Sequence, residues 1–287
     1  MVLVHRLYNA PHHIIRSLSH TIHRPPLVTY LGNSTKTSPD GYTNTLGVSP
    51  TPRTRLGFDQ VFLINLERRP DHLARMQQIA DFIRLNMTVF PATDKNTFDR
   101  STLAPLSMRM ASSHLACWDS HMRVYRAIAD NPAIETALIL EDDIDFEFDL
   151  VAKWTQARAA VGSRPWDIFY LGHCGEGQGS PANAVSANAG LYHSSSPPCT
   201  HAYAVSKLGA RMLLRLLAMP DLPFDLLIGD LIRKRILKSL AMHPPLITQV
   251  HLEGDQSDIN GDGGFGISGE DVEISAEERL NMLKLLP

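Results

Sequence analysis

The sequence LILEDDID at residues 138–145 decides how the rest of the chain is arranged. Together with Thr136 and Ala137, its apolar half predicts a short buried strand over 136–140. The second half brings four carboxylates within five residues, directly after that strand. In open α/β sheets, ligands bind beyond the carboxyl ends of the strands. The stretch therefore predicts a buried strand that leads straight into a binding site.

The four acids of this stretch are Glu141, Asp142, Asp143 and Asp145. Carboxylates this close repel one another, so some stay protonated unless a cation lies among them. A cluster of oxygen ligands suits Mg²⁺ or Mn²⁺ better than Zn²⁺. We expect Asp145 to point to the opposite face if the strand continues. The alternative interpretation is an acidic turn that faces water.

Strands and helices alternate on both sides of this stretch. Short apolar runs predict further strands at 61–64, 88–90, 166–171, 201–205 and within 240–250. Apolar residues at helical spacing, with Pro70 and Ser206 as start signals, predict helices at 70–85, 111–130, 149–161, 206–219 and 224–238. This order predicts an α/β fold with a mostly parallel sheet.

Composition divides the chain into three parts. Residues 1–56 are rich in His, Ser, Thr and Pro and predict a flexible leader, with a mitochondrial transit peptide as the alternative. The predicted domain covers 57–252, and 253–287 predict a flexible, acidic, Gly-rich tail. Within the domain, residues 174–200 predict a long functional or disordered loop. Neither a signal peptide nor a membrane-spanning stretch is recognisable, so the cytoplasm and the secretory lumen both remain open.

The overall composition excludes several classes of protein. The 287 residues include 27 Lys and Arg against 30 Asp and Glu, a formal net charge of −3 that argues against a general nucleic-acid binder. Three cysteines are too few for a disulfide scaffold or a zinc site, and we interpret them as small buried residues. A bond between Cys174 and Cys199 would require an oxidising compartment. The glycines at 172–179 do not follow the phosphate-binding pattern of a phosphoryl-transfer enzyme.

A second polar motif, INLERRPD at 64–71, follows the first predicted strand. Arg68 and Arg69 stand where a strand leads into a helix, a place where arginines and free amides bind phosphate. The alternative is a solvated helix start with an ion pair between Asp71 and Arg75.

In chain order, these motifs resemble glycosyltransferase family 25, which holds bacterial lipooligosaccharide galactosyltransferases and collagen hydroxylysine galactosyltransferases. The matching pieces are INLERR at 64–69, PATD at 91–94, SHLACWDSHM at 113–122, ALILEDD at 137–143, WDIFYLGHC at 166–174, CTHAYAVS at 199–206, FD at 224–225 and PPLITQ at 244–249. The residues of these motifs most resemble those of fungal members of the family. Each piece alone is unspecific, whereas the collinear series is specific.

The resemblance implies a single GT-A-like domain, Rossmann-like at its nucleotide end. Such an enzyme transfers a hexose, galactose or glucose, from a nucleotide sugar such as a UDP-hexose to a hydroxyl acceptor on a glycan, lipid or protein. Mn²⁺ or Mg²⁺ would be held by Glu141, Asp142 and Asp143, which stand in place of a DXD motif. We favour Asp143 on the metal and Asp142 on the metal or ribose. The alternative is an inactive nucleotide-sugar-binding or carbohydrate-binding protein of the same fold.

The resemblance also implies the remaining site residues. Those assigned to the nucleotide sugar are Asn65, Arg68, Arg69, Asp94, His121, Asp142 and His173. Inverting transfer requires a carboxylate that accepts the acceptor's proton. Asp225 is the first candidate for this base, and Asp230 is the alternative. An equally open interpretation is that Asp225 only stabilises the N-terminus of its helix through the helix dipole. For His121 a buried structural role competes with a ligand contact.

Overall fold

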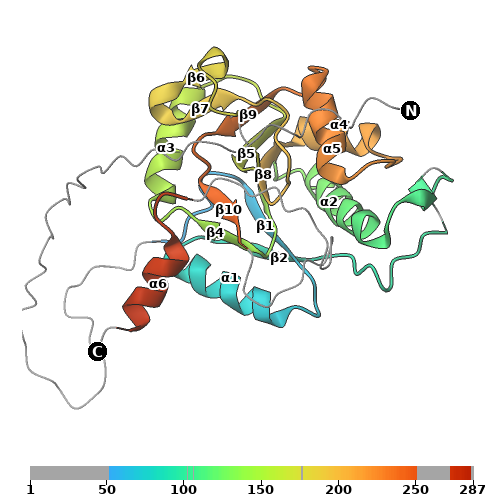
Figure 1. Cartoon of the computed structure of the whole chain (residues 1–287), viewed down its shortest axis with the longest axis horizontal. Helices are drawn as coiled ribbons and strands as arrows, with labels where there is room; N and C mark the ends of the chain where they lie inside the picture. The colour runs from blue at the N-terminus through green and yellow to red at the C-terminus, as the bar shows by residue number, and fades with distance from the viewer. Residues whose placement is uncertain (1–51, 102, 106, 176, 251–271, 286–287) are drawn as a thin grey trace, which may run out of the picture. The chain divides into compact units, whose positions relative to one another are not determined.

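A computed structural model describes residues 52–285, except for 102, 106, 176 and 251–271 (Figure 1). The predicted leader falls almost entirely outside the described residues, as does the first half of the predicted tail. None of the helices in the described part of the chain combines the length and the apolar character needed to cross a membrane.

The central element is an eight-stranded sheet in the order β2-β1-β3-β8-β5-β9-β7-β6. β1 pairs in parallel with β2 and β3, and β5 pairs in parallel with β9, whereas β8 and β7 run antiparallel to their neighbours. The strands are β1 (Gln60–Asn65), β2 (Thr88–Pro91), β3 (Thr136–Leu140), β5 (Ile168–Gly172), β6 (Ala184–Ser186), β7 (Leu191–His193), β8 (Ala202–Ser206) and β9 (Ser239–Met242). Because most strands point the same way, the predicted α/β class is confirmed.

Helices cover both faces of this sheet (Figure 1). One face packs on α1 (Pro70–Phe82) and α3 (Leu150–Val161). The other packs on α2 (Ser112–Asp130), α4 (Lys207–Leu216) and α5 (Phe224–Arg233). Short 3-10 turns lie at Ser107–Arg109, Pro181–Asn183 and Ala187–Ala189.

Successive residues of β3 alternate between the two cores. Leu138 and Leu140 pack with α1 and α3, while Ala137 and Ile139 pack with α2, α4 and α5. The same alternation runs through β1 because side chains along a strand point to opposite faces in turn. The strand ends are thus placed between two helical layers.

Several predicted elements differ from the structure. The predicted loop at 174–200 contains β6 and β7, which extend the sheet edge beside β9. The predicted last strand, within 240–250, is divided into β9 and β10 (Ile247–Gln249), separated by a cis peptide bond between His243 and Pro244. β10 pairs antiparallel with β4 (Ile144–Phe146) in a small second sheet. β4, β6 and β7 were missed because each has only three residues, too few for a detectable period.

The end of the predicted tail is also structured, which corrects the expectation of a flexible segment there. Helix α6 (Ala276–Lys284) is capped by Ser275 and packs beside α1 and β4. Asp145 is buried and accepts hydrogen bonds from Ser275 Oγ at 2.5 Å and from Glu277 N at 3.1 Å. Arg75 of α1 pairs with the Glu277 carboxylate. The hydrogen bonds of Asp145 thus lie with α6. Because β3 ends at Leu140 and β4 begins at Ile144, alternation along one continuous strand does not decide where Asp145 points.

Replacing Asp145 by Ala should lower the free energy of unfolding by about 2–3 kcal/mol, because buried donors lose a charged acceptor. Urea unfolding measures this change. Asp149→Ala is the matched control, since Asp149 is exposed and makes no capping hydrogen bond in the described chain. Its effect should stay within about 0.5 kcal/mol. Equal small effects would contradict the role assigned to Asp145.

Candidate functional site

The carboxyl ends of β1 and β3 meet around Asp142. Asn65, the last residue of β1, donates from Nδ2 to Asp142 Oδ2 at 2.5 Å. His72 of α1 is buried, and its Nδ1 lies 3.2 Å from Asp142 Oδ1. The Arg69 guanidinium lies against the other nitrogen of His72. Asp142 is therefore fixed by residues of β1 and α1.

A cleft of about 520 Å³ lies beside this cluster, at the ends of β1 and β2. Arg68 and Asp94 both line it, and Arg68 Nε donates to Asp94 Oδ2 at 2.9 Å. The hydrogen bond from the Asn96 amide and the Arg68 guanidinium hold the pKa of Asp94 below its ordinary value, against a smaller opposing effect of burial. Arg123 also lines the cleft and donates to Thr93 Oγ1. The cleft thus presents two arginines, two threonines and the carboxylates of Glu67, Asp94 and Asp99 to a polar ligand.

Asp143 lies where β3 passes into the second sheet. Its Oδ2 accepts from Gln249 Nε2 at 2.7 Å, a contact that comes from β10. Its Oδ1 is buried and has no hydrogen-bond partner among the residues that the structure describes. Burial and the neighbouring Glu141 carboxylate raise the pKa of Asp143 to about 7. A cation bound here would offset the cost of ionising this buried carboxyl.

Glu141 points to the opposite side of the sheet from Asp142. Its Oε1 lies 3.2 Å from Nε2 of the buried His121 and accepts from Thr200 Oγ1 at 3.3 Å. Burial raises its pKa, but the hydrogen bond and charge of His121 outweigh this effect and leave the pKa below its ordinary value. His121 therefore contacts Glu141 rather than the cleft at β1 and β2.

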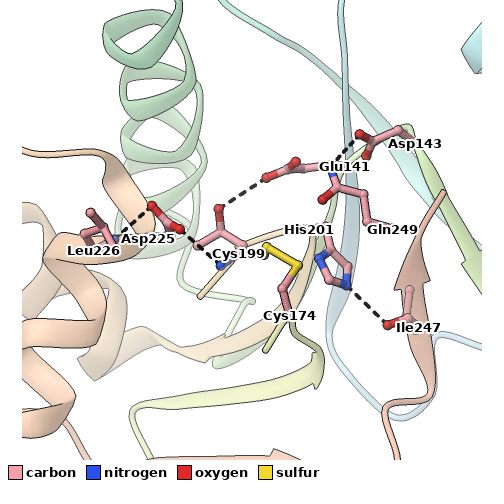
Figure 2. Close-up of a disulfide and its surroundings, with 10 residues drawn as sticks. Glu141, Asp143, Cys174, Cys199, His201, Asp225, Leu226, Ile247 and Gln249 are labelled. Atoms are coloured by element: carbon pink, nitrogen blue, oxygen red, sulfur yellow. Dashed lines mark hydrogen bonds between the residues drawn. A yellow bond between two sulfur atoms is a disulfide. The ribbon is translucent and has the colours of Figure 1, made fainter. Parts of the chain in front are cut away.

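Asp225 lies at the start of α5, across from Glu141 (Figure 2). Its Oδ2 accepts from the backbone amide of Cys199 at 3.2 Å. Cys199 is bonded to Cys174, so the disulfide that the sequence left as a conditional alternative is present. The disulfide ties the segment containing Cys199 and Thr200 to the end of β5 (Figure 2).

Two histidines near the disulfide make backbone contacts. Nε2 of the buried His173 donates to the Met242 carbonyl at 2.8 Å. His201 Nε2 lies 3.2 Å from the Ile247 carbonyl, and burial lowers the His201 pKa to about 4. A Cβ on Gly172 would lie 2.2 Å from that same carbonyl, which explains glycine at this crossing. His173 therefore contacts β9.

Asp230, the alternative base, lies on the other side of α5 from this cluster. It pairs with Arg233 at 2.5 Å and with Lys234 at 2.5 Å. The hydrogen bonds from Lys234 and Arg233 lower the pKa of its carboxyl. Its partners make it a surface ion-pair residue.

The structure brings together two groups of the predicted site residues. Asn65, Arg69 and Asp142 share contacts, and Arg68 and Asp94 share the adjacent cleft. His72, Gln249 and Thr200 also touch the acids, yet sequence reasoning did not select them. Each comes from a segment distant from 141–143, and a single sequence carries no signal of that proximity.

Comparison with known proteins adds an independent finding. The family model described as "Glycosyltransferase family 25 (LPS biosynthesis protein)" matches residues 58–228. Procollagen galactosyltransferase 1 of Danio rerio is 26% identical over 243 residues, covering 75% of this chain and 40% of that protein. Procollagen galactosyltransferase 2 of Homo sapiens is 26% identical, covering 73% and 38%. The chain therefore spans about two fifths of the length of these relatives.

One further relative and one solved structure complete the comparison. The "Probable inactive glycosyltransferase 25 family member 3" of Rattus norvegicus is 27% identical, covering 72% of this chain and 41% of that protein. The crystal structure of a glycosyltransferase involved in the glycosylation of the major capsid of PBCV-1 covers 78% of this chain and 98% of its own, with 9% identity and a TM-score of 0.39.

The raised pKa of Asp143 predicts a pH dependence of stability. Its folded pKa of about 7 exceeds the ordinary 3.8, so between these values the folded state keeps a proton that the unfolded state has lost. The free energy of unfolding of the metal-free protein should therefore fall as pH rises through this window. The Asp143→Asn variant should lack this component, which urea unfolding at several pH values tests. Parallel pH profiles for the two proteins would contradict the burial of an acid here.

Proposed function

Because this chain belongs to glycosyltransferase family 25, we propose that it is a metal-dependent hexosyltransferase. The donor would be a nucleotide sugar, in the first instance UDP-galactose or UDP-glucose. The acceptor would be a hydroxyl group on a glycan, lipid or protein. The relatives named as galactosyltransferases support the reaction class.

The observation that carries the proposal is the unpartnered, buried Oδ1 of Asp143 beside Asp142. Oxygen ligands at the end of a buried strand fit Mn²⁺ or Mg²⁺. Asp143 and Asp142 would hold this ion. When bound, the ion would neutralise charge on the diphosphate of the departing nucleotide. Glu141 belongs to the predicted ligand set by sequence, but its contacts with His121 and Thr200 favour Asp142 and Asp143.

The chain's own residues would orient the donor. Arg68 and Arg69 follow β1, and their guanidinium groups provide the charge-assisted hydrogen bonds that diphosphates accept. The cleft beside Arg68 and Asp94 is of a size and polarity that suits a nucleoside. Asn65 and His72 keep Asp142 in one orientation, so less ordering is required when the donor binds.

Asp225 would act on the acceptor. In an inverting transfer, the acceptor oxygen attacks the anomeric carbon while the bond from that carbon to the phosphate oxygen breaks. The hydroxyl proton passes to a carboxylate oxygen in the same step. Asp225 is half-buried at the start of α5, and the Cys199 amide holds one of its oxygens. This arrangement supports it over Asp230, which is committed to two surface ion pairs.

A second candidate function follows from relatives named inactive in Rattus norvegicus and Mus musculus. In that case the chain would bind a nucleotide sugar or carbohydrate without turnover. The two functions are separated by one comparison: binding of UDP with Mn²⁺, measured by calorimetry, against consumption of a UDP-sugar. Binding without consumption, tested with a panel of acceptors, would favour the second function.

We predict that Asp143→Asn and Asp142→Asn each reduce Mn²⁺-dependent turnover of UDP-sugar by about 100-fold or more, because the ion loses a charged ligand. Calorimetric binding of UDP in the presence of Mn²⁺ should weaken in parallel. Asp149→Asn removes an exposed acid from the same segment and should leave both measurements unchanged. Wild-type turnover in the Asp143 variant would refute the metal assignment.

We predict that Asp225→Asn lowers kcat by about 10²–10⁴-fold while UDP and Mn²⁺ still bind, because only proton transfer from the acceptor is lost. Asp230→Asn, on the same helix, is the matched control and should keep kcat close to that of the wild type. The reverse outcome, with turnover lost only in the Asp230 variant, would assign the base to Asp230.

A further inference from the structure

We propose that Cys117, His121 and Glu141 form a second cation site, suited to Zn²⁺ and separate from the Asp142 and Asp143 pair. One potential ligand atom from each of the three residues lies within 4.8 Å of those of the other two. Cys117 is a free thiol, since the other two cysteines are joined to each other. The inference does not depend on the proposed transferase activity.

The backbone explains why these three residues meet. Cys117 and His121 are four residues apart on α2, so their side chains lie on one face, one turn from each other. Glu141 follows β3 on the face that packs against α2, continuing the positions of Ala137 and Ile139. A regular helix and a buried strand end thus supply all three ligands. Ligands on such elements are held more rigidly than ligands on loops.

The surroundings of His121 favour metal binding through Nε2. Its Nδ1 lies 2.9 Å from Tyr203 Oη, which in turn lies 2.7 Å from Tyr125 Oη, and all three rings are buried. A histidine that ligates a metal through one nitrogen commonly donates a hydrogen bond from the other, usually to a carboxylate, a backbone carbonyl or water. Here the Tyr203 hydroxyl would take the place of that acceptor. In the metal-free protein, Nε2 forms a hydrogen bond with Glu141 Oε1 at 3.2 Å. With the proton kept on Nδ1, the Nε2 lone pair and the Glu141 oxygen could both bind a cation, which would replace that hydrogen bond.

The chemistry of the ligands selects the ion. A thiolate, an imidazole and a carboxylate are the ligand types that bind Zn²⁺, and three protein ligands leave a fourth position open. Soft sulfur ligands disfavour Mg²⁺ and Mn²⁺, which the oxygen ligands of Asp142 and Asp143 suit. Binding would release the Cys117 thiol proton to solvent and would transfer no electrons. Thr200 Oγ1, which donates to Glu141 Oε1, would serve as a support for the carboxylate.

Co²⁺ provides a direct test because a Co²⁺–thiolate bond gives an intense charge-transfer absorption. The full chain, with its disulfide intact, is freed of metal and titrated with Co²⁺ and then Zn²⁺. We expect one equivalent of Co²⁺ to produce the thiolate band and Zn²⁺ to abolish it by displacement. Cys117→Ser should remove the band, and His121→Ala should weaken Co²⁺ binding by about 10-fold or more.

Two controls separate this site from the proposed active site and from misfolding. Asp143→Asn should keep the band, even if the proposed transferase activity is absent. His114→Ala, one turn before Cys117 on the same helix, should also keep it. Circular dichroism reports whether each variant is folded. Absence of the band in the wild type, or its persistence in Cys117→Ser, would overturn the proposal.

Discussion

The alternation of side chains along β3 is the constraint on which the site depends. The strand is buried on both faces, so its residues must fill two separate cores in turn. Continued past Leu140, the same alternation sends Glu141 toward α2 and Asp142 toward α1. Asp143 follows where the chain turns into the second sheet and meets Gln249. Three consecutive acids thus reach three different environments, although the Glu141 charge still raises the pKa of Asp143.

The elements that the sequence predicted well are those with a long or strongly apolar signal. β3 has the predicted bounds, α2 begins one residue from the predicted start, and Ser206 caps α4 as expected. Elements held by distant partners were missed. Helix α6 is polar on most of its surface and is anchored by Asp145 and Arg75, from much earlier in the chain. Such contacts are invisible to local periodicity.

The same distinction explains the candidate site. Asn65, Arg69 and the acids at 141–143 were found because polar residues directly after strands are a local signal. His72, Gln249 and Thr200 were not, because their proximity to the acids arises only from the crossing of strands. His121 occupies a middle position: its helical face was predictable, but its pairing with Glu141 required the register between α2 and β3. The family resemblance supplied order along the chain without supplying these contacts.

The disulfide between Cys174 and Cys199 has a consequence for how this region can vary. It joins the two ends of a segment whose sequence separation is 25, at the point where that segment meets Glu141 and Asp225. Since the ends are bonded, insertions or deletions in between need not change their spacing. The β6–β7 hairpin, which lies between the two cysteines, can therefore change in length or sequence while the disulfide keeps Cys174 and Cys199 beside the acids.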